Sequence, residues 1–447
     1  MKKTMDYTGY YTAESARRKP SAIRALQPLV SLPGMISLGG GMPNAALFPF
    51  KKMSLTLDDG TVLESSGAEL NAALQYSPTP GLPDLVKRLT IMQKAEHQPP
   101  VYSGGGSLSV AVVPGSQDGL AKIFDMLVDH DDSLLIEAPT YSGTLAALEA
   151  KGCNLVGVPT DDLGLNPEKL AAVLGGWDEA RDGGRKPRVL YTIPTGANPT
   201  GASMPLERKR QVYAIAQRHG LLIVEDDPYY YMQYAESRTP SFLSLDTDGR
   251  VMRTDSFSKI LSSGVRIGVV TGPAALVEQM CLHNQATIMH ASGLAQHAVL
   301  SVLKHWGVGE VGEGASADDP VAAQKYPLWE AHLDGLNEFY SKQCDAFFAA
   351  AEAHLNDEQG QPLAEYKRPT AGMFVWMKLR GVPDATELIM TEAIEKKVLL
   401  VPGSAFYPGA PKTPYVRAAF SVASHEQMDT AMQRFGDMLR EAQKKKN

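Results

Sequence analysis

The stretch Thr254-Asp-Ser-Phe-Ser-Lys-Ile-Leu-Ser-Ser-Gly-Val-Arg-Ile-Gly268 decides how the rest of the chain is interpreted. It follows an apparent strand and places one amine, five hydroxyls and one guanidinium within a few residues. Lys259 can condense with a carbonyl as a Schiff base, while Ser256, Ser258 and Arg266 can donate hydrogen bonds to a phosphate. Such a cluster suits a phosphorylated aldehyde. The alternative is a polar loop with an exposed lysine, because short motifs often match by chance.

Ser-x-Ser-Lys followed seven residues later by an arginine resembles the cofactor-lysine segment of the fold-type I pyridoxal-phosphate aminotransferases. Specifically, it resembles the kynurenine/2-aminoadipate aminotransferases, and the resemblance runs over nearly the whole chain. It implies an α/β fold in which a large domain has a mixed, mostly parallel sheet and a smaller α/β domain follows. The further motifs that carry it are Pro20-Ser-Ala-Ile-Arg24, Gln75-Tyr-Ser-Pro78, Asn198-Pro-Thr-Gly201, Glu225-Asp-Asp-Pro-Tyr-Tyr230 and Tyr415-Val-Arg417.

The composition is that of an ordinary globular protein. The chain has 447 residues, of which 44% are hydrophobic and 21% charged, so it can form two or three domains and bury a large core. A net charge of -7 provides no general basic surface and argues against a nucleic-acid partner. Arg17-Arg-Lys19 and Lys444-Lys-Lys446 are short basic patches that we expect to be solvated.

The cysteines and the apolar runs exclude further classes of protein. Cys153, Cys281 and Cys344 lie far apart without Cys-x-x-Cys spacing, so neither a disulfide framework nor a metal site is predicted. No apolar run approaches the length of a membrane span, and the N-terminus lacks an apolar signal core. We therefore expect a soluble, cytoplasmic protein. The mitochondrial matrix stays open, because five basic residues precede position 20 but Asp6 and Glu14 interrupt them.

We expect three segments: an N-terminal arm over residues 1–49, a large cofactor-binding domain over 50–326 and a small C-terminal domain over 327–447. The arm is rich in glycine and proline, with a short helix near Ser21 to Val30. The resemblance places this arm over the substrate, with Gly41 in Gly39-Gly-Gly-Met-Pro43 and with Arg24 facing a distal carboxylate. A surface arginine is the alternative for Arg24.

From about residue 50 to residue 307, short apolar runs alternate with amphipathic stretches, which is typical of strands separated by helices. Polar clusters follow several of these runs, as expected where ligands bind at the carboxyl ends of strands. We expect a surface loop over residues 308–326. We also expect a long helix that joins the two domains over Leu328 to Leu355, and a terminal helix from about Glu426. The expected strands are Val110 to Val113, Ser133 to Glu137, Asn154 to Val158, Val189 to Ile193, Leu221 to Glu225, Val251 to Arg253 and Gly268 to Thr271, then Met373 to Leu379, Val398 to Val401 and Val416 to Phe420.

Pro114-Gly-Ser-Gln-Asp-Gly119 precedes a stretch with apolar residues at helical spacing. Free backbone N–H groups and the positive end of a helix dipole favour an anion there, so Ser116 and Gln117 are candidates for phosphate binding. A simple N-cap serine is the alternative. Because of the free N–H groups, we assign Ser116 and Gln117 to the predicted phosphate site.

Tyr141 and Asn198 are candidates for contacts with the cofactor ring. Tyr141 closely follows an expected strand, and the resemblance implies that its ring stacks on the pyridine, whereas a core or rim tyrosine is the alternative. Thr195-Gly-Ala-Asn-Pro-Thr-Gly201 is a turn sequence in its own right. The resemblance adds that Asn198 donates to the phenolic oxygen and helps to hold the substrate carboxylate. Relatives often carry Asn at positions 195 and 197, where this chain has Thr and Ala.

Three acids in Glu225-Asp-Asp-Pro-Tyr-Tyr-Tyr231 follow the strongest apolar run, and they would repel one another without partners. A metal site is one interpretation. The resemblance implies instead that Asp227 pairs with the pyridinium nitrogen and that Tyr230 reaches the phenolic oxygen. Glu225 and Asp226 are then expected to be structural.

Two further residues are assigned through the resemblance. Tyr76 lies in a turn and corresponds to a tyrosine that reaches the phosphate of the neighbouring subunit, which implies a homodimer. Strand alternation points Arg417 away from its apolar neighbours, which by itself indicates a solvent-facing arginine. The resemblance makes Arg417 the bidentate anchor of the substrate α-carboxylate.

The predicted activity is a two-stage transamination with pyridoxal 5'-phosphate as cofactor. Lys259 moves the proton, Asp227 stabilises the carbanion through the ring, and Arg417 with Asn198 fixes the geometry at Cα. The donor is an aromatic or 2-aminoadipate-type amino acid and the acceptor is 2-oxoglutarate. The alternatives are a pyridoxal-phosphate-dependent C–S lyase or synthase on the same scaffold, and a non-enzymatic binding protein of the regulator type, which would need a DNA-binding module.

Overall fold

The structure is a computed structural model that describes residues 5–26, 29, 32–36, 38–39, 41–103, 106–310 and 326–444, apart from the side chains of residues 24, 25 and 103. Contacts divide the chain into two compact units, each made of two separate segments. The first unit contains residues 1–129 and 242–331, and the second contains residues 130–241 and 332–447. The predicted domain boundaries near residues 49 and 326 remain a prediction. Most of the predicted surface loop, residues 311–325, lies outside the described residues.

The central strands of the first unit are antiparallel. β10 (Gly268–Pro273) pairs with β3 (Leu108–Val113) on one side and with β9 (Val251–Ser256) on the other. The register aligns Gly268 with Val113 and with Ser256, so the carboxyl ends of β3 and β9 lie beside the first residue of β10. This register brings the loop that contains Lys259 to the loop that follows β3.

Helix α7 (Ser116–Leu127) starts directly at that edge. Its N-cap, Gly115, has a φ of 86°, a backbone conformation that glycine adopts without steric cost. The side chains of Leu120, Ile123, Phe124 and Leu127 recur at helical spacing and are buried. Their packing against β9, β10 and α12 (Ala274–Ala286) therefore holds the helix against these strands.

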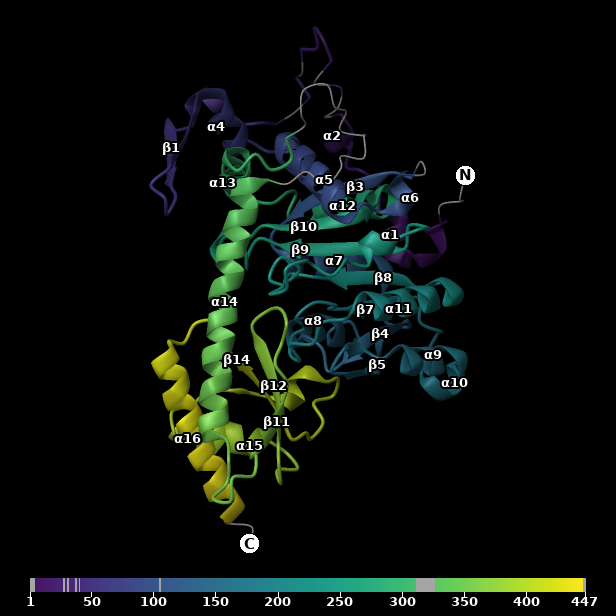
Figure 1. Cartoon of the computed structure of the whole chain (residues 1–447). Coiled ribbons are helices and arrows are strands. Elements are labelled where there is room, and N and C mark those ends of the chain that lie inside the picture. Colours follow the sequence, from purple (N-terminus) through teal and green to yellow (C-terminus); the bar gives the residue numbers. More distant parts are fainter. Residues whose placement is uncertain are drawn as a thin grey trace. The chain divides into compact units, whose positions relative to one another are not determined.

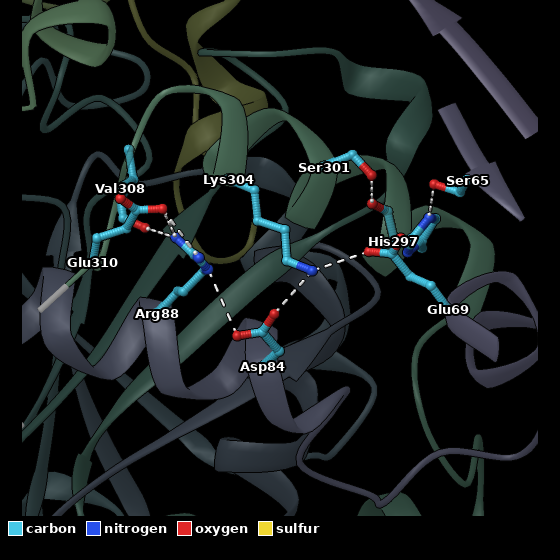
Figure 2. A network of polar contacts seen from close by, with 9 residues as sticks. All are labelled: Ser65, Glu69, Asp84, Arg88, His297, Ser301, Lys304, Val308 and Glu310. Atoms are coloured by element: carbon cyan, nitrogen blue, oxygen red, sulfur yellow. Dashed lines mark hydrogen bonds and ion pairs between the residues drawn. The ribbon is translucent and has the colours of Figure 1, made fainter. Parts of the chain in front are cut away.

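A polar network holds the hairpin of β1 and β2 and helix α4 to the rest of the first unit (Figure 2). Lys304 Nζ lies 3.0 Å from Glu69 Oε1 and 3.1 Å from Asp84 Oδ2. The His297 ring bonds to the Ser65 hydroxyl at 2.6 Å. Tyr76 comes two residues after the end of α4 (Gly67–Leu74), so these contacts hold the helix that precedes Tyr76. The sequence did not predict this hairpin. The other elements of this unit are η1 (Thr8–Tyr10), α1 (Ala13–Arg17), α2 (Ala22–Ala25), η2 (Ala45–Leu47), β1 (Lys52–Thr56), β2 (Val62–Ser66), α4 (Gly67–Leu74), α5 (Pro83–His97), α6 (Pro100–Ser103), η3 (Leu243–Leu245), η4 (Ser263–Val265), α12 (Ala274–Ala286) and α13 (Gly293–His305).

The second unit contains the parallel strands. Their order is β8-β7-β4-β5, and the short β6 pairs antiparallel with β5. These strands by themselves form a mixed, mostly parallel sheet, as the sequence predicts. All seven strands expected between residues 50 and 307 are present in the two units, with ends that differ by a few residues. The elements are β4 (Ser133–Ala138), α8 (Ser142–Glu149), β5 (Asn154–Asp161), β6 (Gly164–Leu165), α9 (Pro167–Gly175), α10 (Glu179–Asp182), β7 (Val189–Thr192), α11 (Leu206–His219) and β8 (Leu222–Asp226).

The C-terminal part of the second unit is an antiparallel sheet, β11-β12-β14-β13, packed against the neighbouring helices α14 and α16 (Figure 1). The predicted strand Val398 to Val401 is wrong over most of its length. Val398 N–H donates to the Ala393 carbonyl at the end of a helix, and Lys397 has a φ of 59°, so extended pairing starts only at Val401. The elements are α14 (Pro327–His354), β11 (Ala364–Tyr366), β12 (Phe374–Leu379), α15 (Thr386–Leu388), the π-helical turn η5 (Ile389–Ala393), β13 (Val401–Pro402), η6 (Gly403–Phe406), β14 (Tyr415–Ala419) and α16 (His425–Lys444).

Alternation on β12 and β14 separates two faces of this sheet. Val416 and Ala418 belong to the core cluster under α14 and α16. Trp376 pairs in register with Arg417, so these two side chains share the opposite face. The predicted orientation of Arg417, away from its apolar neighbours, is confirmed. None of the helices in the described ranges is long and apolar enough to cross a membrane.

Candidate functional site

The loop between β9 and β10 carries Lys259. Phe257 N–H donates to the Ile267 carbonyl at 3.1 Å and closes the loop. Lys259 is half-buried, and burial lowers the pKa of its amine, with the positive charge of Arg266 acting in the same direction. A larger fraction of Lys259 is therefore neutral, and able to act as a nucleophile or base, than in an exposed lysine.

Arg266 is held by this loop through hydrogen bonds to uncharged groups. Its Nη1 lies 3.4 Å from Ser258 Oγ and 3.4 Å from the Ser263 carbonyl, and its Nη2 lies 3.3 Å from the Pro114 carbonyl. Ser256 Oγ accepts from Ser258 N–H at 3.1 Å and so shapes the same turn. Among the described residues Arg266 forms no ion pair with a carboxylate, so its charge is available to an added anion.

Two glycines let the polar groups of this edge come together. A Cβ on Gly115 would collide with the Arg266 guanidinium, and one on Gly268 would lie 2.6 Å from Ser116 N. Arg266 therefore lies directly beside Gly115, the N-cap of α7, and Gly268 lies beside the first residue of that helix, Ser116. A guanidinium close to a helix N-terminus can bind an anion. The predicted phosphate residues of this unit lie together, but their contacts with a phosphate remain a prediction.

The other residues predicted in the first unit lie in its first segment. Tyr76 is 48% exposed and contacts His290 edge to face, with ring centroids 6.1 Å apart. Arg24 belongs to α2, and its side chain lies outside the described part of the chain. Gly41 is exposed, with nothing within 4 Å of the place where a Cβ would stand. The predicted roles of these residues remain predictions.

Arg417 in the second unit lies in a different environment. Its Nη1 donates to Asn198 Oδ1 at 2.9 Å. Its Cζ lies 4.6 Å from the centre of the Phe374 ring and 5.1 Å from that of Phe406. The Nε atom is buried without a hydrogen-bond partner, and within the described ranges no carboxylate forms an ion pair with this arginine. Burial lowers the pKa of Arg417, while Tyr229 and Tyr141 act in the opposite direction.

The loop that presents Asn198 packs closely on the start of β12. A Cβ on Gly196 would meet the backbone of Ala371 at 2.8 Å, and one on Gly201 would collide with the Phe374 carbonyl. Asn198 itself is 5% exposed. Because its Oδ1 accepts from Arg417, its amide nitrogen is the group left to donate to another ligand.

Tyr141 stands at the start of α8, where it precedes the first helical residue. A Cβ on Gly143 would lie 2.6 Å from the Tyr141 hydroxyl, so the glycine gives this ring its place over the first turn. The adjacent Thr140 N–H donates to the Phe406 carbonyl at 2.9 Å. This hydrogen bond connects the Tyr141 loop to one of the two rings beside Arg417.

Asp227 and Tyr230 follow β8 in a tight turn. Tyr230 N–H lies 3.2 Å from the Asp227 carbonyl, and both side chains are buried. A buried carboxylate at the end of a parallel strand can pair with a protonated ring nitrogen. That pairing remains a prediction for Asp227, as does the phenolic contact for Tyr230.

The neighbouring acids support the sheet. Tyr191 donates to Asp226 Oδ2 at 2.8 Å, and Thr192 donates to Glu137 Oε1 at 2.6 Å. Burial raises the pKa of Glu137 to about 7, although the hydrogen bonds that it accepts from Thr192 and from Ile193 N–H act in the opposite direction. Asp226 therefore has the structural surroundings expected for it, and in the described residues no three His, Cys, Asp or Glu side chains gather as metal ligands.

Sequence reasoning did not find the two rings beside Arg417. Phe374 stands in a predicted strand, where its alternation with Trp376 could have placed it on the face of Arg417. Phe406 lies in the short η6 turn, for which the sequence contains no periodic signal. Its proximity to Arg417 depends on how η6 packs on β14, and only the structure shows this.

The chain is similar to known proteins in both sequence and structure. Residues 55–311 match the family model "Aminotransferase class I and II". The chain is 41% identical, over 98% of its own length and all of the relative, to the mitochondrial kynurenine/alpha-aminoadipate aminotransferase of Bos taurus. The structure of aminotransferase Aro8 from Candida albicans is similar with a TM-score of 0.83 and 26% identity, covering 99% of each chain. A Pyrococcus horikoshii kynurenine aminotransferase, solved in complex with PMP, KYN and KYA, is similar with a TM-score of 0.73 and 25% identity over 98% of each chain.

Proposed function

Because the chain belongs to the class I and class II aminotransferases, we propose that it transfers the amino group of an aromatic or 2-aminoadipate-type L-amino acid to 2-oxoglutarate. Pyridoxal 5'-phosphate is the cofactor of this enzyme, and amino acids and 2-oxo acids are its substrates. The proposed donor class follows the names of the similar bovine and archaeal enzymes. The named relatives are all aminotransferases, so a C–S lyase is not favoured.

The observation that carries the proposal is the environment of Arg417. A half-buried guanidinium without a carboxylate partner among the described residues is costly unless an anion arrives. Its hydrogen bond to Asn198 uses one nitrogen and leaves others for a bidentate contact. The α-carboxylate, which every amino acid and 2-oxo acid carries, is an anion of the right shape.

In the first unit, the residues around Arg266 and the start of α7 support a site for the phosphate of the cofactor. The place where Cβ atoms of Gly115 and Gly268 would stand is filled instead by Arg266 and by the start of α7. We assign Ser116, Gln117, Ser256, Ser258 and Arg266 to the phosphate, and Lys259 to the aldehyde. When bound, pyridoxal phosphate supplies an aldehyde that condenses with amines and a ring that accepts electrons from Cα.

The remaining roles follow from the chemistry of the side chains. Lys259 Nζ, whose pKa is lowered, would take the proton from the substrate Cα and deliver a proton to the C4' carbon of the cofactor. The Asp227 carboxylate keeps a proton on the ring nitrogen, and Tyr230 and Asn198 donate to the phenolic oxygen. Arg417 and Asn198 hold the carboxylate so that the Cα–H bond has one orientation. Tyr141 covers a face of the ring.

We also propose a homodimer in which Tyr76 reaches the phosphate of the other subunit. Its half-exposed ring supports this assignment. Mixing a Tyr76→Phe, Arg417→Ala double variant with the unmodified chain tests it. If Tyr76 serves the other subunit, each site of a mixed dimer lacks one of the two residues and activity falls. If Tyr76 serves its own subunit, one site of each mixed dimer stays intact. The compartment stays a proposal: cytoplasm or mitochondrial matrix, the latter supported by the word mitochondrial in the name of the bovine relative.

Arg24 bears on the identity of the donor, because a second positive charge would favour an acidic side chain. With Arg24→Ala we expect a larger loss of kcat/KM for 2-aminoadipate than for phenylalanine. Equal losses would remove the assignment. Gly41 is assigned to the same side of the substrate.

The test of the function is the absorption spectrum of the cofactor-loaded protein during addition of 2-aminoadipate or kynurenine, followed by 2-oxoglutarate. We expect the band of the lysine-bound cofactor to disappear with the amino acid and to return with the oxo acid. Release of ammonia and pyruvate from cysteine conjugates would favour a lyase instead. If Lys259→Ala kept the band, the assignment of the cofactor lysine would be wrong.

A further inference from the structure

We propose that Phe406 is a positioning residue for the substrate carboxylate, acting through Arg417 and through the Tyr141 loop. The inference rests on the proposed function, because it takes Arg417 as the carboxylate anchor. It adds a residue outside the phosphate, lysine and carboxylate motifs, located in the short turn η6 rather than in a strand or a long helix.

The first step concerns how Arg417 keeps one orientation. Its side chain has one described polar contact, to Asn198, and a buried Nε without a partner. A long side chain with one hydrogen bond would otherwise populate several rotamers. Phe374 and Phe406 lie 4.6 and 5.1 Å from its Cζ, within the range of a cation–π contact, and both rings are buried. The rings therefore limit the positions that the guanidinium can adopt.

The second step concerns what holds Phe406. Its side chain is fully buried. Trp376 meets its ring edge to face at 5.6 Å and is itself stacked on Tyr415, with centroids 5.2 Å apart. A Cβ on Gly403 would lie 2.6 Å from the Tyr415 carbonyl, so η6 packs directly on β14. Phe406 is thus fixed to the same strand that carries Arg417.

The third step concerns the second contact of Phe406. Its carbonyl accepts from Thr140 N–H at 2.9 Å, and Thr140 precedes Tyr141. Through its ring Phe406 contacts the carboxylate anchor, and through its backbone it holds the loop of the aromatic residue assigned to the cofactor ring. One residue therefore sets both positions relative to each other, which is what a fixed Cα–H geometry requires.

The experiment compares Phe406→Leu with a matched control. Phe348→Leu removes the same kind of contact in the same unit, because Arg368 Cζ lies 5.4 Å from the Phe348 ring, yet neither residue belongs to the site. For Phe406→Leu we expect KM to rise about tenfold for the amino acid and for the oxo acid alike, with kcat changed less than about threefold. Phe406→Tyr should restore most of the loss, and Phe348→Leu should leave both KM values within about twofold.

A binding measurement separates positioning from general damage. Calorimetric titration with 3-phenylpropanoate, a carboxylate that cannot react, should show a Kd about tenfold higher for Phe406→Leu and unchanged for Phe348→Leu. If Phe406→Leu does not fold, trifluorophenylalanine at position 406 keeps the size of the ring and weakens its negative face, and KM should still rise. Unchanged KM and Kd in that protein would overturn the proposal.

The two proposals fail in different ways. If Arg417→Lys leaves both KM values and the Kd unchanged, the proposed role of Arg417 is wrong. If Arg417→Lys weakens binding but Phe406→Leu and the fluorinated protein do not, only the role of Phe406 is wrong. Equal effects of Phe406→Leu and Phe348→Leu would also overturn that role.

Discussion

Arg266 and Arg417 are both arginines without a carboxylate partner in the described part of the chain, but they are held in opposite ways. Arg266 is exposed, and its hydrogen bonds go to Ser258 and to backbone carbonyls. Arg417 is half-buried, with Phe374 and Phe406 beside its guanidinium. Uncharged hydrogen-bond acceptors hold Arg266, whereas Arg417 lies beside aromatic rings and has one hydrogen bond, to Asn198.

The difference matches the two anions that we assign to them. A cofactor phosphate carries more charge and stays bound through many turnovers, so several donors from a loop and a helix N-terminus suit it. A substrate carboxylate must enter and leave in each half-reaction. Partial desolvation strengthens its contact with Arg417, while the rings restrict the guanidinium without adding a competing carboxylate.

The largest effect should come from Lys259, which stands in the same loop as Arg266 and which we expect to exchange a proton with the substrate. Lys259→Ala should lower kcat about 10³-fold or more, because a positioned base contributes on the order of 10² to 10⁴ and the covalent attachment is lost as well. Single-turnover rates with the cofactor-loaded protein measure this. Lys342→Ala, which removes a lysine paired with Glu338 on α14, should change kcat by less than twofold.

Arg417→Lys should raise KM about 100-fold for both substrates, equivalent to about 3 kcal/mol, because an ammonium cannot replace a planar bidentate donor between two rings. Retention of the cofactor during dialysis should stay unchanged. A loss of cofactor with an unchanged KM would reverse the assignment of the two arginines.

Arg266→Lys should have the opposite profile and a smaller size. We expect cofactor affinity to fall about tenfold, since one of several phosphate donors is altered, while KM stays within about twofold once the cofactor is saturating. Fluorescence titration of the cofactor-free protein provides the affinity. If KM rose as strongly as in Arg417→Lys, the two arginines would not have separate tasks.

The smallest effect concerns the titration of Lys259. Burial and the charge of Arg266 both lower the pKa of its amine, so Arg266→Gln should raise that pKa and Arg417→Gln should not. The neutral amine is the reactive form and exists above the pKa. The pH midpoint of the reaction of the cofactor-free protein with pyridoxal should therefore move upward in Arg266→Gln. A downward movement, or an equal shift in Arg417→Gln, would contradict the local origin of the shift.

The sequence predicted the alternating order of strands and helices, because apolar runs and glycine-rich turns are local signals. It also predicted that Arg417 leaves the apolar face, since strand alternation requires it. It did not predict the β1–β2 hairpin, the late start of β13 or the ring of Phe406 beside Arg417. These depend on contacts between distant segments, or on how a short turn packs, and no periodicity in the chain encodes them. Most site residues came from a resemblance between motifs rather than from the chemistry of single residues.

The division of each unit into two separate segments has a consequence for synthesis on the ribosome. β3 ends at Val113, but its antiparallel partner β10 begins at Gly268, after the whole first segment of the second unit has been made. At ordinary rates of translation, about 10 to 30 s pass between the two strands. During that time the apolar strand β3 cannot pair with β10, and unpaired strands of this kind are prone to aggregation. The yield of folded protein should therefore depend on chaperones that protect the nascent chain until Gly268 has emerged.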